Sequence, residues 1–366
     1  MAPVVLALNK DPQFQSRVCV TAQHRQMMDE VLSLFDIRPN WDLNMMQPNQ
    51  DLADLAARIL LGVGGVIREE RPDIVLVHGD TTTCFAAAFA AFNHRVPIGH
   101  IEAGLRTWDL AAPFPEEANR TLVSRLATYN YAPTCQARNN LLAEGISDNR
   151  IEVTGNTVID ALFTVRDKIS LSGIDRWKSH FGAELTVRLV DPSVRKVLVT
   201  SHRRENFGEG LRELVSAVRD LARCDLSWEF LFPVHPNPNV RGPVEEILGD
   251  EPNIRLISPQ NYEAFVWLMS QSDIILTDSG GIQEEATSLG KPVLIAREKT
   301  ERTEALQLGC ARLVGTSREC IMRAVLEFLA PTSSARSRDT QPNPFGDGSA
   351  ARRIVEHLSQ RRGSIR

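Results

Sequence analysis

The sequence predicts an α/β protein with two doubly wound, parallel-sheet domains. Three observations support this class. Short apolar runs rich in β-branched residues alternate with segments of helical periodicity over most of the 366 residues. These runs lack polar alternation, which is typical of strands covered by helices on both faces. The strand–helix rhythm occurs twice, before and after a stretch of weak periodicity at 168–192, and the length fits two domains of roughly 100–200 residues each.

The elements follow this rhythm in order. In the first half, the predicted strands are 17–21, 73–78, 97–101 and 151–154, and the predicted helices are 27–35 and 51–68. In the second half, the predicted strands are 196–200, 229–234, 273–277 and 292–296. A break rich in Ser, Pro, Asn and Gly at 331–348 precedes a final helix at 350–360. We therefore expect domains at 1–167 and 168–348, and a C-terminal helix within 349–366 that packs back on the first domain. In such an arrangement a ligand binds between the domains, at the carboxyl ends of the strands.

Composition and charge exclude several classes of protein. Lys and Arg number 41 against 46 Asp and Glu, a net charge of −5, which argues against a nucleic-acid binder. The longest apolar runs, such as 84–92, are far shorter than the ~20 residues that span a bilayer. The six cysteines form no CxxC pair, which indicates small buried core residues rather than a disulfide frame or a zinc site. No secretion-signal pattern opens the sequence, so we expect a cytoplasmic protein.

Three carboxylates follow strands or open helices in the first half. They are Asp80 in HGDTTT (78–83), Glu102 in HIEAGLRT (100–107) and Glu116 in PEEANR (115–120). Each one alone is also compatible with a helix cap or a first-turn acid. Three carboxylates on one side of a sheet, however, suit acid and base roles, because burial in one cleft separates their pKa values.

The second half supplies groups that bind anions. The segment DSGGIQEEA (278–286) follows a predicted strand and opens a helix, so its glycines allow close approach of a phosphate to free N–H groups at the helix start. A glutamate one turn later can accept hydrogen bonds from ribose hydroxyls, and an arginine in TERT (300–303) can bind a diphosphate. The residues with these expected roles are Ser279, Gly280, Gly281, Glu285 and Arg302.

Further polar residues lie just beyond predicted strands. His202 and Arg203 emerge at the end of strand 196–200, where they can face an anion. Gln23, Gln26 and His235 lie in similar places, but taken singly they are more typical of turns and caps.

Ten motifs occur in a fixed order along the chain. They are HGDTTT, HIEAGLRT, PEEANR, TGNTVID, HRREN, HPNPNVR, DSGGIQEEA, GKPVL, TERTEA and NPFGDG. This series resembles the non-hydrolysing UDP-N-acetylglucosamine 2-epimerase family of bacterial type, from Met1 to about Leu358. The resemblance implies a GT-B-like fold, with two Rossmann-like domains and the active site in the cleft between them. It also implies a homodimer that uses neither a nicotinamide cofactor nor a metal.

The resemblance further implies a reaction and roles for residues. Family members interconvert UDP-N-acetylglucosamine and UDP-N-acetylmannosamine for surface polysaccharide synthesis, by loss of UDP to a 2-acetamidoglucal and its re-addition. Asp80, Glu102 and Glu116 match the acid/base carboxylates, with base and acid left unassigned, and His202 matches a histidine on the diphosphate side. The UDP-binding residues implied are Gln260, Phe265, Ser279, Gly280, Gly281, Glu285 and Arg302.

A second site for the substrate is also implied. Many bacterial members are activated by their own substrate, and Gln23, Gln26, Arg203 and His235 match the contacts of that activating site. Asn49 stands where some members have an arginine, which leaves the strength of the activation open.

The sequence departs from the family pattern at two places. Thr303 replaces a proline, next to Arg302, which is kept. Family members also carry a strand and the segment GTRPEAIK ahead of the Met-Ala-Pro with which this sequence opens. We therefore expect that the first strand of the N-terminal sheet, and an arginine and a lysine that contact substrate, are absent from these residues because of a misassigned start or a truncated gene.

Three other functions remain open from the sequence. A glycosyltransferase of the same architecture should lack the three-carboxylate set. A hydrolysing 2-epimerase would release free N-acetylmannosamine and UDP. An inactive nucleotide-sugar binder would follow if the first strand and its loop are truly absent.

Overall fold

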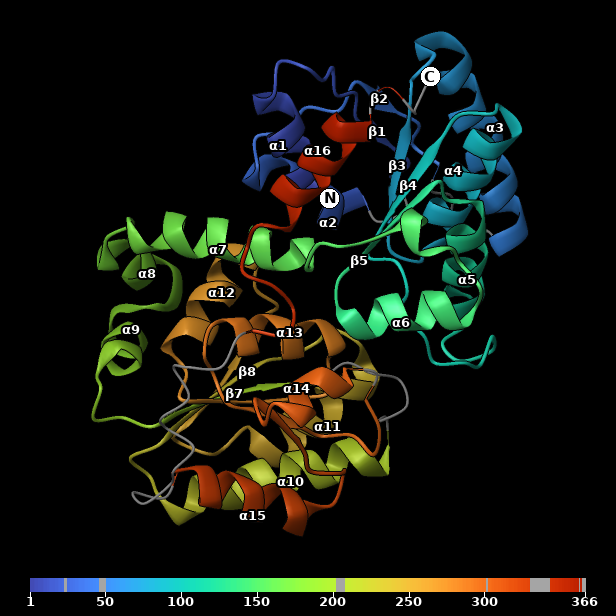
Figure 1. Ribbon diagram of the computed structural model, residues 1–366. Coiled ribbons are helices and arrows are strands. Elements are labelled where there is room, and N and C mark those ends of the chain that lie inside the picture. The colour runs from blue at the N-terminus through green and yellow to red at the C-terminus, as the bar shows by residue number, and fades with distance from the viewer. Residues whose placement is uncertain are drawn as a thin grey trace. The chain divides into compact units, whose positions relative to one another are not determined.

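The computed structural model describes residues 1–22, 25–45, 51–201, 208–300, 302–329, 343–361 and 363. The chain divides into two compact units, unit 1 (Met1–Ala161 with Phe345–Arg366) and unit 2 (Leu162–Pro344). The divisions fall a few residues before the predicted domain limits of 167 and 348. Each unit contains a parallel sheet flanked by helices (Figure 1), so the predicted α/β class is confirmed.

Unit 1 is built around a four-stranded sheet with the order β3-β4-β5-β6 and a separate pair, β1-β2. Its elements are α1 (Ala2–Lys10), β1 (Cys19–Val20), α2 (Arg25–Leu34), β2 (Trp41–Asp42), α3 (Leu52–Glu70), β3 (Val75–His78), α4 (Thr82–Asn93), β4 (Ile98–Ile101), α5 (Glu116–Leu126), β5 (Tyr129–Ala132), α6 (Cys135–Ala143), the 3₁₀ turn η1 (Asp148–Arg150), β6 (Ile151–Val153) and α16 (Ala350–Arg361). The predicted strands and helices of this half coincide with β1, β3, β4, β6, α2, α3 and α16, whereas β2 and β5 were not predicted.

Helices cover both faces of the four-stranded sheet (Figure 1). On one face, α3, α4 and α5 bury apolar side chains against Val77 of β3 and Ile98 of β4. On the other face, α1 and α16 pack on each other and on Ile101 and Tyr131. Because both faces are covered, the carboxyl ends of the strands are where polar side chains of this sheet reach solvent.

Strand β3 has one paired and one unpaired edge in the described part of the chain. The N–H groups of Val75 and Gly79 donate to the carbonyls of Pro97 and Ile101, on the β4 side. Successive N–H groups of a strand point to opposite sides. The N–H group of Leu76 therefore faces the other edge of β3. Among the described residues no ladder joins this edge to β1, which pairs only with β2.

Unit 2 holds a six-stranded parallel sheet with the order β12-β11-β10-β7-β8-β9. Helix α7 (Thr157–Ser170) leads into it, and its other elements are α8 (Ile174–Phe181), α9 (Ala183–Val190), β7 (Lys196–Thr200), α10 (Glu209–Cys224), β8 (Glu229–Pro233), α11 (Pro238–Leu248), β9 (Ile254–Ile257), α12 (Tyr262–Gln271), β10 (Ile274–Thr277), α13 (Gly280–Ser288), β11 (Val293–Ile295), α14 (Thr303–Gln307), β12 (Ala311–Leu313) and α15 (Arg318–Leu329). The four strands predicted for this half are confirmed, and β9 and β12 were not predicted.

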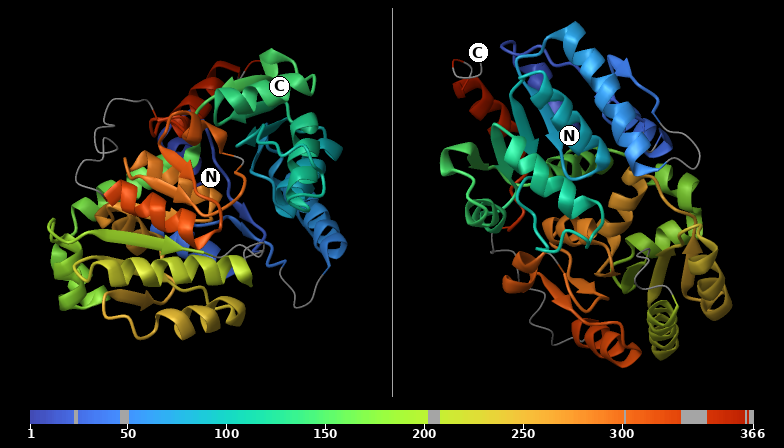
Figure 2. Two further views of the ribbon diagram at one scale, coloured as in Figure 1. Left: turned by 90° about the horizontal axis from the view of Figure 1, so that it is seen from below. Right: turned by 90° about the vertical axis from the view of Figure 1, so that its right-hand side faces the viewer.

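The unit 2 sheet is flanked by helices (Figure 2), and successive side chains of its strands point to opposite faces. Val197, Val199 and Phe230 lie in a core with α10, α11 and α15. Leu198 and Leu231, which alternate with them, are fully buried on the opposite side. Parallel strands buried on both faces are therefore present, as the unbroken apolar runs predicted. Within the described residues, no helix is both long and apolar enough to cross a bilayer.

The structure differs from the sequence-based expectations at two places. The stretch 168–192, in which the sequence showed only weak periodicity and no helix was predicted, contains α8 and α9. Trp177 of α8 stacks on Trp267 of α12, with ring centroids 4.7 Å apart, and Arg188 of α9 pairs with the buried Glu229. These tertiary contacts, with the burial of Trp177 and Leu189, fix both short helices to the unit 2 core.

The expectation that the cysteines are small buried core residues is wrong. Only Cys84 is buried, whereas Cys19, Cys135, Cys224 and Cys320 are exposed. Their apolar neighbours face the core from the same strands and helices, while these side chains lie on the outer faces or at the ends. All six are free thiols.

Candidate functional site

The first carboxylate of the site lies in the turn that follows β3. Gly79 has a left-handed backbone with φ of +72°, which is accessible to glycine at no steric cost. Thr81 caps α4, because its side chain accepts the N–H of Cys84 at 3.2 Å. Asp80 is therefore not the helix cap. Its Oδ2 instead accepts a hydrogen bond from Arg120 at 3.2 Å, and its side chain is 30% exposed.

Glu102 lies beside this turn, at the end of the neighbouring strand β4. A Cβ placed on Gly79 would be 3.4 Å from Oε2 of Glu102, so the Asp80 turn and Glu102 are adjacent. Oε2 of Glu102 lies 3.6 Å from Nε2 of His78, and Oε1 accepts a 3.4 Å hydrogen bond from Asn156. Desolvation lowers the pKa of His78 well below its ordinary value, so the imidazole is neutral. The Glu102 side chain is 21% exposed and remains accessible to a ligand.

The backbone of Glu102 is strained. Its φ of +64° lies in the left-handed region, which costs a side-chain-bearing residue roughly 1–2 kcal/mol. Such strain is concentrated at functional sites, where the surrounding structure enforces it.

This strain gives a stability prediction. We expect Glu102→Gly to be more stable than Glu102→Ala by about 1 kcal/mol, because glycine adopts a positive φ without a clash. Urea unfolding of the two variants measures the difference. At the exposed Ala57, inside helix α3, Ala57→Gly should instead lose about 1 kcal/mol. A Glu102→Gly variant no more stable than Glu102→Ala would show that the position is unstrained.

The third predicted carboxylate, Glu116, begins helix α5 next to a second glutamate with a different environment. Glu117 is 1% exposed and accepts the N–H groups of Thr107 and Trp108 at 3.0 and 3.1 Å and Nε of Arg120 at 2.7 Å. Glu117 therefore fixes the loop after Glu102. Glu116 is half-buried and makes no hydrogen bond to described residues, so its carboxylate is available for chemistry.

Helix α5 is attached to the Asp80 turn by two side chains that the sequence analysis did not single out. Asn119 donates to the Asp80 carbonyl at 2.9 Å, and Arg120 bridges Asp80 and Glu117. The helix that carries Glu116 is thereby fixed to Asp80. The three predicted carboxylates thus come from connected segments at the carboxyl end of one sheet.

His100 supports the same turn from within β4. Its ring is fully buried, and Nε2 lies 2.8 Å from the Gly79 carbonyl. Because a carbonyl only accepts, Nε2 carries the proton and donates. Burial lowers the pKa of His100 to about 4, so the ring is neutral near pH 7. His100 was part of a motif in the sequence, but its role follows only from this contact.

In unit 2, the start of helix α13 provides N–H groups for an anion. Ser279 is the N-cap residue, but its side chain makes no capping hydrogen bond. A Cβ placed on Gly281 would meet no atom within 4 Å, so the backbone here is open to a ligand. Free N–H groups and the positive end of the helix dipole favour a phosphate at this position. Ser279, Gly280 and Gly281 therefore lie where an anion site was predicted.

Glu285 lies one turn further along α13 and is buried. Its Oε1 accepts a 2.6 Å hydrogen bond from Tyr262, the first residue of α12. In the sequence, Tyr262 lies between Gln260 and Phe265, two of the residues that the family resemblance implies for UDP binding. Phe265 is half-buried one helical turn after Tyr262, and Gln260 is hydrogen-bonded to His180 at 2.7 Å. The sequence analysis named both flanking residues but not Tyr262.

Arg302 is held by a partner that the sequence analysis also did not name. Nε of Arg302 donates to Oε1 of Glu284 at 2.9 Å, and both side chains are largely buried. Glu284 precedes Glu285 on α13, so the pair attaches the Arg302 loop to the predicted UDP-binding helix. The expected contact of Arg302 with a diphosphate stays a prediction.

Several predicted residues lie outside the described residues. These are Gln23, His202 and Arg203, and the side chain of Gln26. His235 is exposed, and its Nδ1 accepts the N–H of Asn237 at 3.1 Å, which is the turn role expected of it taken singly. Its expected place in an activating site stays a prediction.

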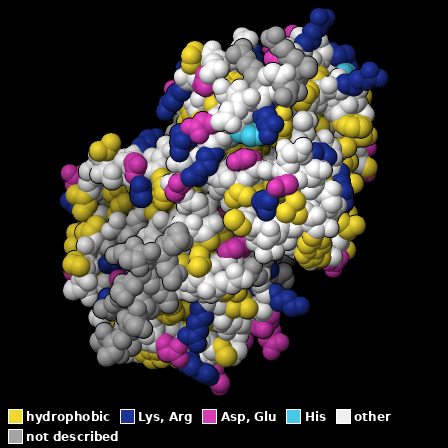
Figure 3. Space-filling view, viewed as in Figure 1, with side chains coloured by type: hydrophobic (Ala, Val, Ile, Leu, Met, Phe, Trp, Pro, Cys, Tyr) yellow, Lys and Arg dark blue, Asp and Glu magenta, His cyan; other side chains and the backbone are white. Residues whose placement is uncertain are grey.

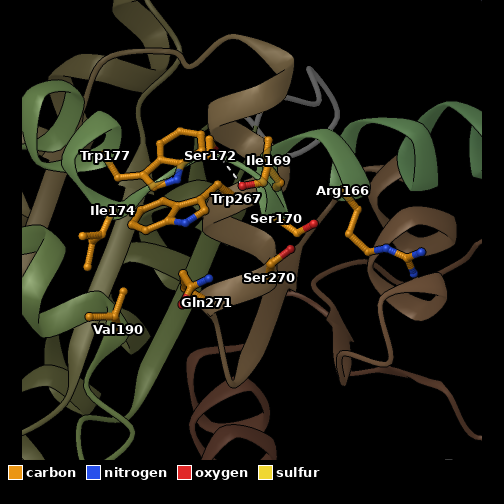
Figure 4. Close-up of a pocket in the computed structure, with 10 residues that line it drawn as sticks. All are labelled: Arg166, Ile169, Ser170, Ser172, Ile174, Trp177, Val190, Trp267, Ser270 and Gln271. Carbon is orange, nitrogen blue, oxygen red and sulfur yellow. Dashed lines mark hydrogen bonds between the residues drawn. The ribbon is translucent and has the colours of Figure 1, made fainter.

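A pocket of about 290 Å³ lies elsewhere in unit 2 (Figure 4). The stacked Trp177 and Trp267 form one side of it, and Arg166 points away at the opposite side. None of its lining residues was predicted to be functional, and it contains neither a carboxylate nor a glycine-rich turn. In the described parts of the chain, no group of three or more His, Cys, Asp or Glu side chains is arranged to hold a metal ion.

Comparisons with known proteins identify the family of this chain. A family model described as UDP-N-acetylglucosamine 2-epimerase matches residues 6–359. An Escherichia coli protein named UDP-N-acetylglucosamine 2-epimerase is 52% identical over 365 residues, which cover 100% of this chain and 96% of the relative.

Solved structures are similar as well. The UDP-GlcNAc 2-epimerase from Neisseria meningitidis bound to UDP-GlcNAc is 46% identical and has a TM-score of 0.90, over 98% of this chain and 96% of that one. The Methanocaldococcus jannaschii enzyme in complex with UDP-GlcNAc and UDP is 30% identical, with a TM-score of 0.79 over 98% and 95%. These matches confirm the predicted GT-B-like fold class. Together with the carboxylates that converge at one sheet end and the open helix start of α13, they show that the chain belongs to the UDP-N-acetylglucosamine 2-epimerase family.

Proposed function

We propose that this protein interconverts UDP-N-acetylglucosamine and UDP-N-acetylmannosamine. The observation that carries the proposal is the adjacency of Asp80 and Glu102, two partly exposed carboxylates at the ends of neighbouring strands. Inversion at C2 requires proton removal from one face and delivery to the other, so it needs more than one acid/base group. The family membership supports the same reaction.

The reaction divides into two halves. In the first, a carboxylate takes the C2 proton, the electron pair forms the C1–C2 double bond, and the C1–O bond breaks as UDP leaves. In the second, UDP adds back to C1 of the 2-acetamidoglucal and a proton is delivered to the opposite face of C2. There is no net oxidation. Unit 1 supplies Asp80, Glu102 and Glu116 as the proton-transfer groups, without assignment of base and acid.

Unit 2 binds the UDP portion in this proposal. The N–H groups at the start of α13 and Arg302 bind the diphosphate, and Glu285 binds the ribose. Binding the leaving diphosphate to fixed N–H dipoles stabilises the charge that develops as the C1–O bond breaks. His202 is assigned to the diphosphate by the family resemblance alone.

One incubation tests the proposal. The chain is mixed with UDP-N-acetylglucosamine and the products are followed by NMR. An equilibrium mixture with UDP-N-acetylmannosamine supports the epimerase. Release of free N-acetylmannosamine and UDP indicates the hydrolysing enzyme instead, and binding of UDP without turnover indicates an inactive binder.

The proposal extends to the setting of the enzyme. We place it in the cytoplasm, where its product serves surface polysaccharide synthesis. A second UDP-sugar molecule binds at Gln23, Gln26, Arg203 and His235 and activates it. A rate that rises more steeply than hyperbolically with UDP-N-acetylglucosamine concentration is the expected sign of this activation.

We further propose that the chain forms a homodimer through the outer surface of α3, α4 and α5. Leu61, Phe89, Phe92 and Leu122 are exposed on these three helices, which pack side by side in unit 1. Apolar side chains are visible in this part of the molecule in Figure 3. Contiguous exposed apolar residues are typical of an interface.

A charge on this surface should dissociate the dimer. Phe92 is 53% exposed, so Phe92→Glu is expected to leave the fold intact and to place a charge in the apolar contact. Light scattering should give a dimer mass for the unaltered chain and a monomer mass for Phe92→Glu. Leu171→Glu, at a side chain that is 89% exposed in unit 2, is the matched control and should stay dimeric. A Phe92→Glu protein that remains a dimer would place the interface elsewhere.

A further inference from the structure

In unit 2, the hydroxyl of Tyr262 is hydrogen-bonded to one of the two carboxylate oxygens of Glu285. The Tyr262 hydroxyl donates to Oε1 of Glu285 at 2.6 Å, and Oε2 accepts no hydrogen bond from any described residue. Burial and the neighbouring carboxylate raise the pKa of Tyr262, so the hydroxyl stays protonated and acts as a donor. One oxygen of the carboxylate is therefore fixed by the protein while the other is left as an acceptor.

We propose that Tyr262 is a positioning residue for nucleotide binding: its hydroxyl holds Oε1 of Glu285, so that Oε2 accepts a hydrogen bond from a ribose hydroxyl. This inference rests on the proposed function, because it takes the UDP portion of the substrate as the ligand. Tyr262 does not touch the reacting carbons in this scheme. Through Glu285, it increases the affinity for ligands with a ribose diol relative to ligands without one.

The surroundings of Glu285 place its ionisation near neutral pH, so the effect of Tyr262 on ribose binding should depend on pH in this range. The pKa of Glu285 is raised to about 7 in total: burial is the largest cause, the Tyr262 hydrogen bond acts in the opposite direction, and the adjacent Glu284 adds to the rise. The charge of Glu284 is balanced by Arg302 from the N-cap of α14. At the end of β10, Asp278 accepts a 2.9 Å hydrogen bond from Ser201. On α12, Glu263 is paired with Lys168 and Arg176.

The direction of the pH dependence follows. Below pH 7 Glu285 is mainly protonated, and a neutral carboxyl is a weaker acceptor than a carboxylate. Ribose recognition should therefore be weak at pH 6 and should strengthen as pH rises through about 7. Removal of the Tyr262 hydroxyl withdraws the hydrogen bond that favours the ionised form, so the transition should move to higher pH.

The test compares two ligands across pH. Binding of UDP and of 2′-deoxy-UDP to the full chain is measured by calorimetry between pH 6 and pH 9. The ratio of their dissociation constants isolates the 2′-hydroxyl, because titration of the phosphates is common to both ligands. For the unaltered chain the preference for UDP should increase by about fivefold as pH rises through the transition, the gain expected when a neutral acceptor becomes a charged one.

Tyr262→Phe should lose most of the preference for UDP over 2′-deoxy-UDP at pH 7. It should recover this preference at pH 9, where Glu285 is ionised even without the Tyr262 hydrogen bond. A purely structural role for Tyr262 would lower both affinities alike and would not be rescued by pH. Tyr131→Phe, which removes a buried hydroxyl bonded to His357 in unit 1, is the matched control and should behave as the unaltered chain. A ratio that is independent of pH, or unchanged in Tyr262→Phe, overturns the inference. Failure of UDP itself to bind at any pH would instead overturn the proposed function.

Discussion

Glu102→Gln is expected to lower kcat for epimerisation by about 10²–10⁴-fold, the usual contribution of a positioned acid or base. Glutamine keeps the size of the side chain and its contact with Asn156, but it cannot exchange a proton. The same loss is expected for Asp80→Asn and Glu116→Gln, because each step of the inversion needs a carboxylate. Formation of UDP-N-acetylmannosamine, followed by NMR, measures the rates.

A matched carboxylate controls for a general effect of removed charge. Glu152 is exposed on β6 of the same sheet, and Glu152→Gln should keep the unaltered rate. Running the reaction in D₂O adds a second measurement, because the C2 position gains deuterium only when protons are exchanged there. If Glu102→Gln turns over as fast as Glu152→Gln, Glu102 is not an acid/base residue.

The sequence located the carboxylates of the site because chemistry-bearing residues in parallel α/β folds follow strand ends. Asp80 comes directly after β3 and Glu102 directly after β4, so both were identifiable from short apolar runs followed by a polar motif. The start of α13 was predictable for the same reason. The roles of the residues that support these groups were not. His100, Arg120 and Tyr262 act through contacts with segments distant in sequence, which no local pattern encodes.

The errors in the fold have the same origin. Strand β5 was not predicted because it contains Asn130, which is fully buried and donates to the Ser124 carbonyl. Helices α8 and α9 have mixed charge and were not predicted, and the Trp177–Trp267 stack and the pairing of Arg188 with Glu229 join them to the rest of unit 2. In each case a tertiary contact outweighs a weak local preference.

The neighbouring residues Glu116 and Glu117 allow a direct test of which carboxylate transfers protons and which one stabilises the structure. Both belong to the first turn of α5, and residue type and spacing do not rank them; only the family resemblance selected Glu116. Glu117 accepts three hydrogen bonds while 1% exposed, whereas Glu116 accepts none from the described residues. An amide at Glu117 would place an NH₂ group against an N–H donor or the Arg120 guanidinium, and among the described residues the buried Arg120 would keep only its longer contact with Asp80.

We therefore expect Glu117→Gln to lower the free energy of unfolding by about 3 kcal/mol, within the range for breaking a buried charged network. Glu116→Gln should change it by less than about 0.5 kcal/mol, as expected of a side chain without such contacts. Urea unfolding monitored by circular dichroism compares the stabilities of the two variants, and epimerase assays on the folded proteins compare their activities.

Because Glu117 holds the Thr107–Trp108 loop and Arg120, the main effect of Glu117→Gln should be a loss of stability. Glu116→Gln should fold normally, and its main effect should be a lower kcat. Equal stabilities of the two variants would mean that the contacts of Glu117 contribute nothing beyond those of an exposed helix-start carboxylate.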